Sequence, residues 1–117
     1  MATPLHLRPH FDSSGDETAQ AMKTSGGGLY YLHVTNINAV DAFIQLFDVA
    51  AGSVTVGTTT PTLSFLVPAG SGSLNGAFTE TFSPPIDFGV AITYACATSA
   101  TGNGALGTAL IVNGLYR

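Results

Sequence analysis

Charged residues are scarce in this sequence of 117 residues. Asp, Glu, Lys and Arg make up only 9% of it, whereas an ordinary soluble domain has about 25%. The formal net charge is −4, and no Lys or Arg occurs between Thr24 and Tyr116. The folded body therefore has no basic patch, which argues against nucleic acid and anionic membranes as partners. A surface of Thr, Ser and Asn with so few charges has little electrostatic repulsion, which favours a protein embedded in an assembly.

Cysteine and long apolar runs are also nearly missing. Cys96 is the single cysteine, so no disulfide can form within the chain, and nothing indicates secretion. The first residues lack the cationic and apolar regions of a signal peptide, so none is expected. No apolar run approaches the roughly 18 residues of a membrane-spanning helix. We therefore expect no membrane partner.

Short runs that alternate between apolar and polar residues dominate what remains. The first two, 29–35 and 42–47, are rich in β-branched and aromatic residues, which favour strands. The segment 36–41 between them holds Asn and Asp, which favour a chain reversal, so we expect these two strands to pair. Further strands are predicted over 62–67, 74–82, 90–97 and 109–116. At this spacing, and without a helical period beyond one turn, they predict an all-β fold, an antiparallel β-sandwich.

The N-terminal residues 1–27 differ from the rest in composition. They carry five of the ten charged residues and two of the three histidines, and they end in a glycine-rich run. We therefore divide the chain into an extended N-terminal arm, 1–27, and a β-sandwich domain, 28–117. The arm is expected to serve assembly and not folding, so a chain that begins at Gly27 should fold as well as the full chain. Within the arm, we expect one helical turn at 18–22 and a short edge strand that Pro9 ends.

Strict alternation assigns faces to the strands. In the first run it places Tyr30, Leu32 and Val34 on one face and His33 on the other. The strand at 90–97 has a face of larger side chains: Val90, Ile92, Tyr94 and Cys96. Its second face could pack against another sheet or a neighbouring subunit, and it is made of Ala91, Thr93, Ala95 and Ala97. We expect Cys96 to be buried and unreactive, because desolvation disfavours the thiolate.

Glycine and proline mark the expected irregularities of the strands. The Ser83-Pro84-Pro85 run is expected to end the strand over 74–82. Gly76 and Gly114 are expected at bulges or at close approaches of the backbone.

Two motifs resemble binding sites and are better explained otherwise. Gly102, Gly104 and Gly107 match the G-x-G-x-x-G spacing of dinucleotide-binding loops, but that motif works only between a strand and a helix. Here a strand follows, so we interpret the motif as a glycine-rich turn. The chain has one cluster with metal-ligand chemistry: His6, His10, Asp12 and His33. Pro9 prevents the helix that would align the first two histidines, so no metal site is expected.

Catalytic constellations are equally absent from the pattern. The body has four carboxylates: Asp41, Asp48, Glu80 and Asp87. Paired acids hydrolyse glycosides in clefts with aromatic and polar support, but this chain has no Trp and no Arg between Thr24 and Tyr116 to orient a substrate. No serine lies in a G-x-S-x-G setting. We therefore expect no catalytic, cofactor-binding or metal-binding residue, no cofactor, and a protein that is not an enzyme.

Tyrosines leave one binding function open. Four of them could form a platform on which a sugar ring stacks, as in carbohydrate-binding modules: Tyr30, Tyr31, Tyr94 and Tyr116. Tyrosines at strand centres more often fill a core or a subunit interface. Sugar binding is therefore the alternative hypothesis.

Residues 28–117 resemble a family of small virion proteins encoded by tailed phages and prophages. The resemblance lies in these fragments: Gly28-Leu-Tyr, Val34-Thr-Asn36, Phe43-Ile-Gln-Leu-Phe47, Val56-Gly-Thr-Thr-Thr-Pro61-Thr-Leu63, Leu66-Val-Pro-Ala-Gly70, Ile86-Asp-Phe88, Ile92-Thr-Tyr94-Ala95 and Val112-Asn-Gly-Leu-Tyr-Arg117. The chain departs from the family pattern at Ala91, where glycine is usual, and at Asp87, where a basic residue is common. Its segment 74–85 is also longer, and the arm shows no match.

This resemblance implies a jelly-roll-like β-sandwich that decorates a phage capsid. The expected function is that of a decoration (cement) protein, which stabilises the head lattice by contacts with the major capsid protein. A homotrimer on the capsid surface of the virion, assembled in the host cytoplasm, is expected. A head-fibre or tail-tip adhesin, or a carbohydrate-binding module, is the alternative.

Overall fold

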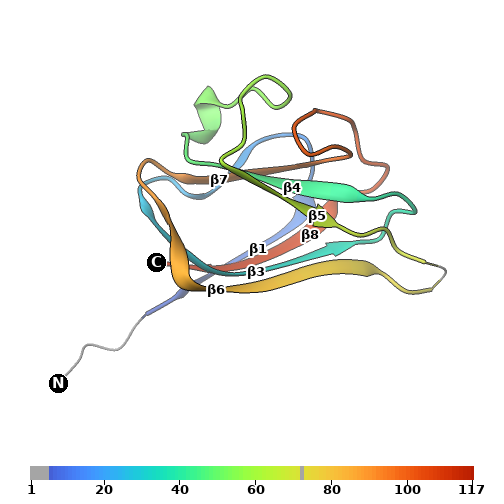
Figure 1. The fold of residues 1–117 in the computed structure, drawn as a ribbon, viewed down its shortest axis with the longest axis horizontal. Helices are drawn as coiled ribbons and strands as arrows, with labels where there is room; N and C mark the ends of the chain where they lie inside the picture. Colours follow the sequence, from blue (N-terminus) through green and yellow to red (C-terminus); the bar gives the residue numbers. More distant parts are fainter. Residues whose placement is uncertain (1–5, 72) are drawn as a thin grey trace.

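The computed structural model describes residues 6–71 and 73–117, and it consists of two antiparallel four-stranded sheets packed face to face (Figure 1). The first sheet has the strand order β1 (Arg8–Gly15), β8 (Leu110–Tyr116), β3 (Gly27–Asn36) and β6 (Gly76–Phe88). The second sheet has the order β2 (Gln20–Lys23), β7 (Ile92–Ala97), β4 (Ala42–Phe47) and β5 (Leu63–Val67). Outside the two sheets, the described residues of the chain form loops and one 3₁₀ turn, Ala51–Ser53. The predicted all-β sandwich is confirmed.

The hydrophobic core lies between the two sheets. Each strand turns alternate side chains inward, and those side chains are largely apolar. The fully buried members include Leu32, Val34, Ile44, Leu46, Ile92, Tyr94, Cys96, Leu110 and Val112. The predicted burial of Cys96 is confirmed, because this residue faces the core from β7.

The strands β3 and β4 do not pair with each other, which corrects the expected hairpin. They belong to different sheets, and the segment 36–41 crosses between them. Its two asparagines are buried: the Asn36 amide donates to Val40 O (2.9 Å) and Val67 O (3.2 Å). The Asn38 amide donates to Thr108 O at 2.8 Å and thereby ties the crossing to the start of β8. The polar residues that indicated a turn therefore bridge the sheets instead.

The N-terminal segment is part of the sandwich, which corrects the expected arm over the described residues of 1–27. Strand β1 pairs with β8, and β2 pairs with β7, so each sheet gains an edge strand from this segment. Residues 18–22 form no helical turn, because β2 begins at Gln20 and inserts Met22 into the core. The remaining part of the expected arm, 1–5, lies outside the described residues.

Polar inward-facing side chains explain why β1 did not resemble a sandwich strand. His10 and Asp12 occupy the core side of β1, where an apolar residue would be expected. Both meet the hydroxyl of Tyr94, which lies in the opposite sheet (2.8 Å and 2.6 Å). Buried polar groups are tolerated when they are hydrogen-bonded, so this strand needs no apolar alternation.

Two loops of the chain itself cover the outer face of the second sheet. The loops 48–62 and 98–109 lie over β7 and β4 (Figure 1). Gln45 on this face donates to Ser99 O (3.0 Å) and Gly102 O (2.9 Å), and Thr93 donates to Val49 O (2.6 Å). The second face of β7 therefore packs against loops of the same chain and not against another sheet. It needs no neighbouring subunit to cover it.

Gly76 lies at a close approach of the backbone, as expected, because a Cβ there would collide with the Pro68 carbonyl. The other irregularities of the strands differ from those expected. Strand β6 continues through Ser83-Pro84-Pro85 to Phe88, which is compatible with its position at the edge of the first sheet. Gly114 is not a bulge: a Cβ there would lie 2.7 Å from the Met22 methyl, so glycine makes room for that side chain. The register of this sheet shifts instead between Leu29 and Tyr31 and, in β1, between Asp12 and Gly15.

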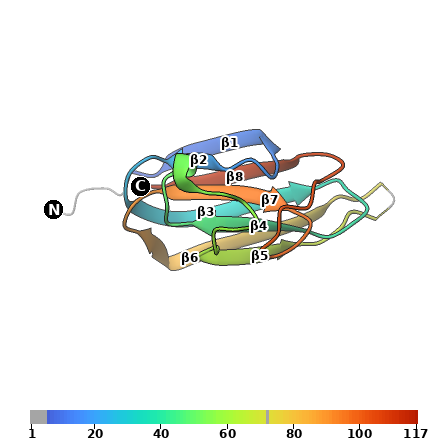
Figure 2. The ribbon, with the colours of Figure 1, turned by 90° about the horizontal axis from the view of Figure 1, so that it is seen from above.

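The four edge strands lie in pairs on the two sides of the sandwich. Figure 2 shows β1 with β2 on one side and β5 with β6 on the other. Removal of β1 and β2 would uncover Tyr94 and leave β7 and β8 without a neighbour on one side.

A chain that begins at Gly27 is therefore predicted not to fold cooperatively. Native domains are stable by only about 5–15 kcal/mol, and this truncation removes two paired strands together with Met22 from the core. Thermal unfolding followed by circular dichroism of the truncated and full chains checks it. Equal midpoints for the two chains would contradict the assignment of β1 and β2 to the sandwich.

A matched pair of glycine variants tests the packing of the β6 start. A Cβ at Gly76 would collide with the carbonyl of Pro68, a backbone group, whereas a Cβ at Gly52 would meet nothing within 4 Å. Gly76→Ala is predicted to lower the free energy of unfolding by about 1–3 kcal/mol. Gly52→Ala is predicted to change it by less than about 0.5 kcal/mol. Denaturant titration of both variants measures the difference, and equal values would show that the close approach is absent.

Candidate functional site

A β-bulge in β3 turns two consecutive tyrosines to the outer face of the first sheet. Strict alternation would place Tyr30 on the same face as Leu32, as expected from the sequence, and Leu32 faces the core. Instead the register of β3 shifts between Leu29 and Tyr31 against both of its neighbours. Leu29 and Leu32 are both fully buried, while Tyr30 and Tyr31 between them stay partly exposed. Bulges commonly re-aim side chains in this way.

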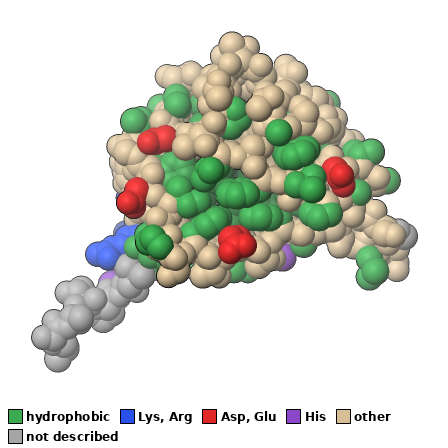
Figure 3. Space-filling model, in the orientation of Figure 1, with side chains coloured by type: hydrophobic (Ala, Val, Ile, Leu, Met, Phe, Trp, Pro, Cys, Tyr) green, Lys and Arg blue, Asp and Glu red, His purple; other side chains and the backbone are tan. Residues whose placement is uncertain are grey.

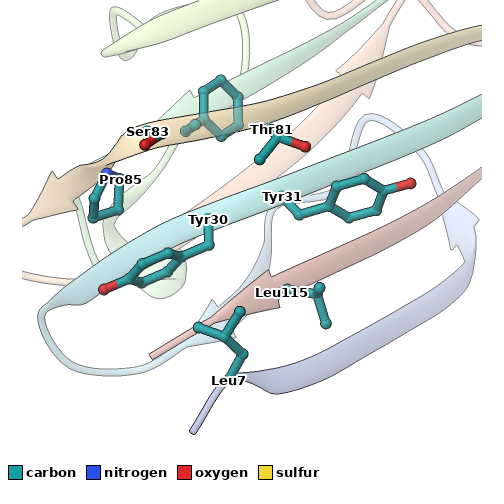
Figure 4. Close-up of a pocket in the computed structure, with 8 residues that line it drawn as sticks. Leu7, Tyr30, Tyr31, Thr81, Ser83, Pro85 and Leu115 are labelled. Atoms are coloured by element: carbon teal, nitrogen blue, oxygen red, sulfur yellow. The ribbon is translucent and has the colours of Figure 1, made fainter. Parts of the chain in front are cut away.

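The two tyrosines line a pocket, called here the tyrosine pocket, of about 420 Å³. Its walls are Leu7, Tyr30, Tyr31, Thr81, Phe82, Ser83, Pro85 and Leu115. Figure 4 shows the two rings splayed apart along β3, with Thr81, Ser83 and Pro85 on one side and Leu7 and Leu115 on the other. Half of the eight lining residues carry a hydroxyl group, and none carries a charge.

The wall contributed by β6 depends on an excursion of that strand. Leu29 pairs with Ile86 and Tyr31 with Thr81, so one residue of β3 faces four residues, 82–85, of β6. This excursion brings Ser83 and Pro85 to the pocket. The proline run that seemed to end a strand therefore builds one side of the pocket.

A second exposed feature, called here the side face, lies where the edge strands β5 and β6 meet. Phe65 stacks on Phe78 with centroids 4.9 Å apart and lies 5.9 Å from Phe82. These rings and Leu63 are only partly buried. Figure 3 shows a contiguous apolar area there with separate carboxylates around it. Glu80, on β6 between Phe78 and Phe82, is exposed.

The histidines and acids of the N-terminal cluster are separated in the fold. His10 and Asp12 meet at the Tyr94 hydroxyl, whereas His33 lies on the outer face of β3, 2.6 Å from Thr79 Oγ1. His6 is exposed. Over residues 6–71 and 73–117, no three His, Cys, Asp or Glu side chains come together as metal ligands would.

The Tyr94 hydroxyl is the centre of a hydrogen-bonded network between the sheets. It donates its single proton to Asp12 Oδ2 at 2.6 Å, so the Nε2–H of His10 donates to the phenol oxygen at 2.8 Å. Burial, supported by Asp12, raises the pKa of Tyr94. Burial also lowers the pKa of His10, against the opposing charge of Asp12. The neutral histidine is therefore the form that fits the folded state.

Two of the body carboxylates hold loops. Asp48 accepts hydrogen bonds from the backbone N–H groups of Gly89 (2.9 Å), Val90 (2.7 Å) and Ala91 (3.2 Å), which lower its pKa. Asp41 accepts one from Ala69 N at 2.9 Å. Two of the four body carboxylates are thus engaged in fixing turns.

The remaining sequence candidates have structural positions. Burial raises the pKa of the Cys96 thiol. The glycine motif at 102–107 lies in a loop that covers the second sheet, where Gly102 O accepts from Gln45. Tyr94 is fully buried and Tyr116 packs against the core, so the expected four-tyrosine platform is reduced to Tyr30 and Tyr31. The pocket that they line depends on a bulge for which the sequence contains no recognised signal.

Comparison with known proteins does not identify a family: no family model, no curated protein and no solved structure matches this chain. Among the described residues, no helix has the length and apolar character needed to cross a membrane.

The stability of the fold is predicted to fall as the pH drops below the ordinary pKa of histidine, about 6.5. Because the pKa of His10 is lowered in the folded state, the unfolded chain binds the proton more readily in this window, and acid favours unfolding. A His10→Gln variant should lose this part of the pH dependence. Denaturant unfolding across this pH range measures both chains, and identical slopes would contradict the prediction.

Proposed function

We propose that this protein is a structural subunit of a phage virion, a capsid decoration (cement) protein that binds across joints between major capsid protein subunits. The observation that carries the proposal is the side face. Large contiguous apolar patches are unusual on monomeric soluble proteins and mark interaction sites. Here partly buried aromatic rings from two edge strands lie in a contiguous apolar area at the surface. The resemblance of residues 28–117 to phage virion proteins supports the same assignment.

The edge strands of the side face carry features that limit unspecific pairing. Glu80 pairs with the buried Leu32 and so points towards the gap between the sheets. Pro84 and Pro85 interrupt the donors of β6. Inward charges and prolines at edges prevent one sheet from adding to another. A partner would therefore bind through side chains, with the phenylalanines as contacts, and not through strand addition.

The strand pairing supports a jelly-roll assignment within this proposal. The pairs are nested along the chain, with β1 against β8, β2 against β7, β3 against β6 and β4 against β5. We infer from this nesting that the sandwich is a jelly roll, an architecture found in viral capsid and lectin domains. Fold alone does not decide function, so the side face remains the argument.

A lattice of such subunits needs no chemistry to strengthen a capsid. A standard interface buries about 1,600 Å² in total, and a homotrimer would engage the lattice at three points with avidity. The described residues of the side face include no Lys or Arg, so attachment through the aromatic rings should depend only weakly on salt.

A second candidate, a head-fibre or tail-tip adhesin or carbohydrate-binding module, is favoured by the tyrosine pocket. That pocket opens on the outer face of the first sheet and shares one residue, Phe82, with the side face.

The test uses particles stripped of the protein and then supplied with it. Intact protein is expected to bind and to keep DNA inside heated particles. Glu80→Lys places an opposite charge between Phe78 and Phe82 and is predicted to weaken attachment roughly tenfold, as a change at an interface centre does. Glu17→Lys makes the same charge change in the β1–β2 connection, on the other side of the sandwich, and should attach normally.

Two outcomes would overturn the proposal. In the first, particles without the protein keep their DNA as well as complete ones on heating. In the second, Glu80→Lys and Glu17→Lys attach equally well. If the stripped particles also fail to adsorb to host cells, the adhesin replaces the decoration protein as the better assignment.

A further inference from the structure

The tyrosine pocket is more than a gap between strands, because the bulge that forms it disturbs the regular ladder. Without the bulge, Tyr30 would point into the core beside Leu32 and the sheet would continue unbroken. The register of β3 shifts against both of its neighbours, β6 and β8. The regular strand pairing is therefore interrupted on both sides of β3 at this point. This interruption places two aromatic rings on the surface, where neither contributes to the main core.

We propose that this pocket binds a neutral sugar ring, a pyranose unit of a glycan. The inference does not rest on the capsid function and concerns the outer face of the first sheet, which adjoins the side face at Phe82. Aromatic rings offer apolar faces against which the C–H groups of a sugar can pack. The hydroxyl groups of the pocket can both donate and accept hydrogen bonds, as a sugar requires.

The hydroxyl groups are available for a ligand. Four lining residues carry one: Tyr30, Tyr31, Thr81 and Ser83. Within residues 6–71 and 73–117, the side-chain hydrogen bonds involve neighbours such as Thr79 and Thr35 but leave these four hydroxyls free. Partially exposed rings with free hydroxyls nearby match a ligand that is apolar on its faces and polar at its rim.

The lining argues against other ligands. No charged side chain lines the pocket, so a phosphate, a carboxylate or a cation would lose its water without gaining a partner. An aliphatic side chain of another protein would fit the rings but would cover hydroxyl groups without bonding them, which costs free energy. The volume of about 420 Å³ lies within the range of small-molecule sites and can hold a ring with its substituents.

The test is a titration of the intact chain with neutral oligosaccharides of glucose, galactose, mannose and N-acetylglucosamine. Ligand-observed saturation-transfer NMR detects contact, and chemical-shift titration gives the affinity. At least one saccharide is expected to bind. Tyr30→Ala and Tyr31→Ala should each weaken that binding roughly tenfold, about 1.4 kcal/mol. Tyr31→Phe keeps the ring and should weaken it only a few-fold.

Controls separate the pocket from the rest of the sheet. Phe11→Ala removes a ring that is 68% exposed, in β1 of the same sheet but outside the pocket, and should leave binding unchanged. Thr81→Val and Ser83→Ala remove hydroxyls at exposed positions, so they test the polar contacts even if a tyrosine variant fails to fold. Each should weaken binding several-fold, and thermal unfolding confirms that the variants are folded.

Three results would overturn the inference. One is that no saccharide of the panel binds. Another is that Phe11→Ala weakens binding as much as Tyr31→Ala does. The third is that a poly-L-proline peptide binds in a Tyr31-dependent manner while the saccharides do not, which would make the pocket a peptide site. The saccharide titration uses the isolated chain, so a negative result would not affect the capsid proposal. Likewise, a negative result of the test on stripped particles would not affect the sugar-binding proposal.

Discussion

The side of the sandwich formed by β1 and β2 depends on the hydrogen bonds of the Tyr94 hydroxyl. A phenol at the edge of an apolar core is stable only if its proton and oxygen are satisfied. Asp12 accepts the proton and His10 donates to the oxygen, and both residues come from β1 in the opposite sheet. The same contacts that satisfy the phenol thus bring the N-terminal strand onto the fold and seal one side of the core.

The two sides of the sandwich are closed by different physical means. Beside β1 and β2, hydrogen bonds to a buried phenol bridge the sheets. Beside β5 and β6, the stacked rings of Phe65, Phe78 and Phe82 fill the gap and remain partly exposed. Polar groups that are already hydrogen-bonded within the chain offer a partner few further contacts. Exposed aromatic surface, by contrast, can still be buried by a partner. This asymmetry is the reason why we propose the β5–β6 side as the surface for a partner.

The outer faces of the two sheets differ in the same manner. Over β7 and β4, two loops bond to Gln45 and Thr93 and cover the small side chains beneath them. On the outer face of the first sheet, β3 and β6 instead line the tyrosine pocket (Figure 4). The two surfaces proposed for binding therefore differ: the side face is formed by aromatic rings, and the largely apolar tyrosine pocket also carries four hydroxyl groups.

The sequence by itself determined the strands of the body and the burial of Cys96, because period-two alternation and local turn residues depend only on neighbouring positions. Only the tertiary structure decided how the strands pair. The polar residues 36–41 cross between sheets, and β1 could not be recognised because His10 and Asp12 find their partner at Tyr94, far along the chain. The tyrosine pocket was equally hidden. The alternation placed Tyr30 on the same face as Leu32. Tyr30 lies on the opposite, outer face because a bulge opposite residues 82–85 shifts the register, a constraint set by two strands together.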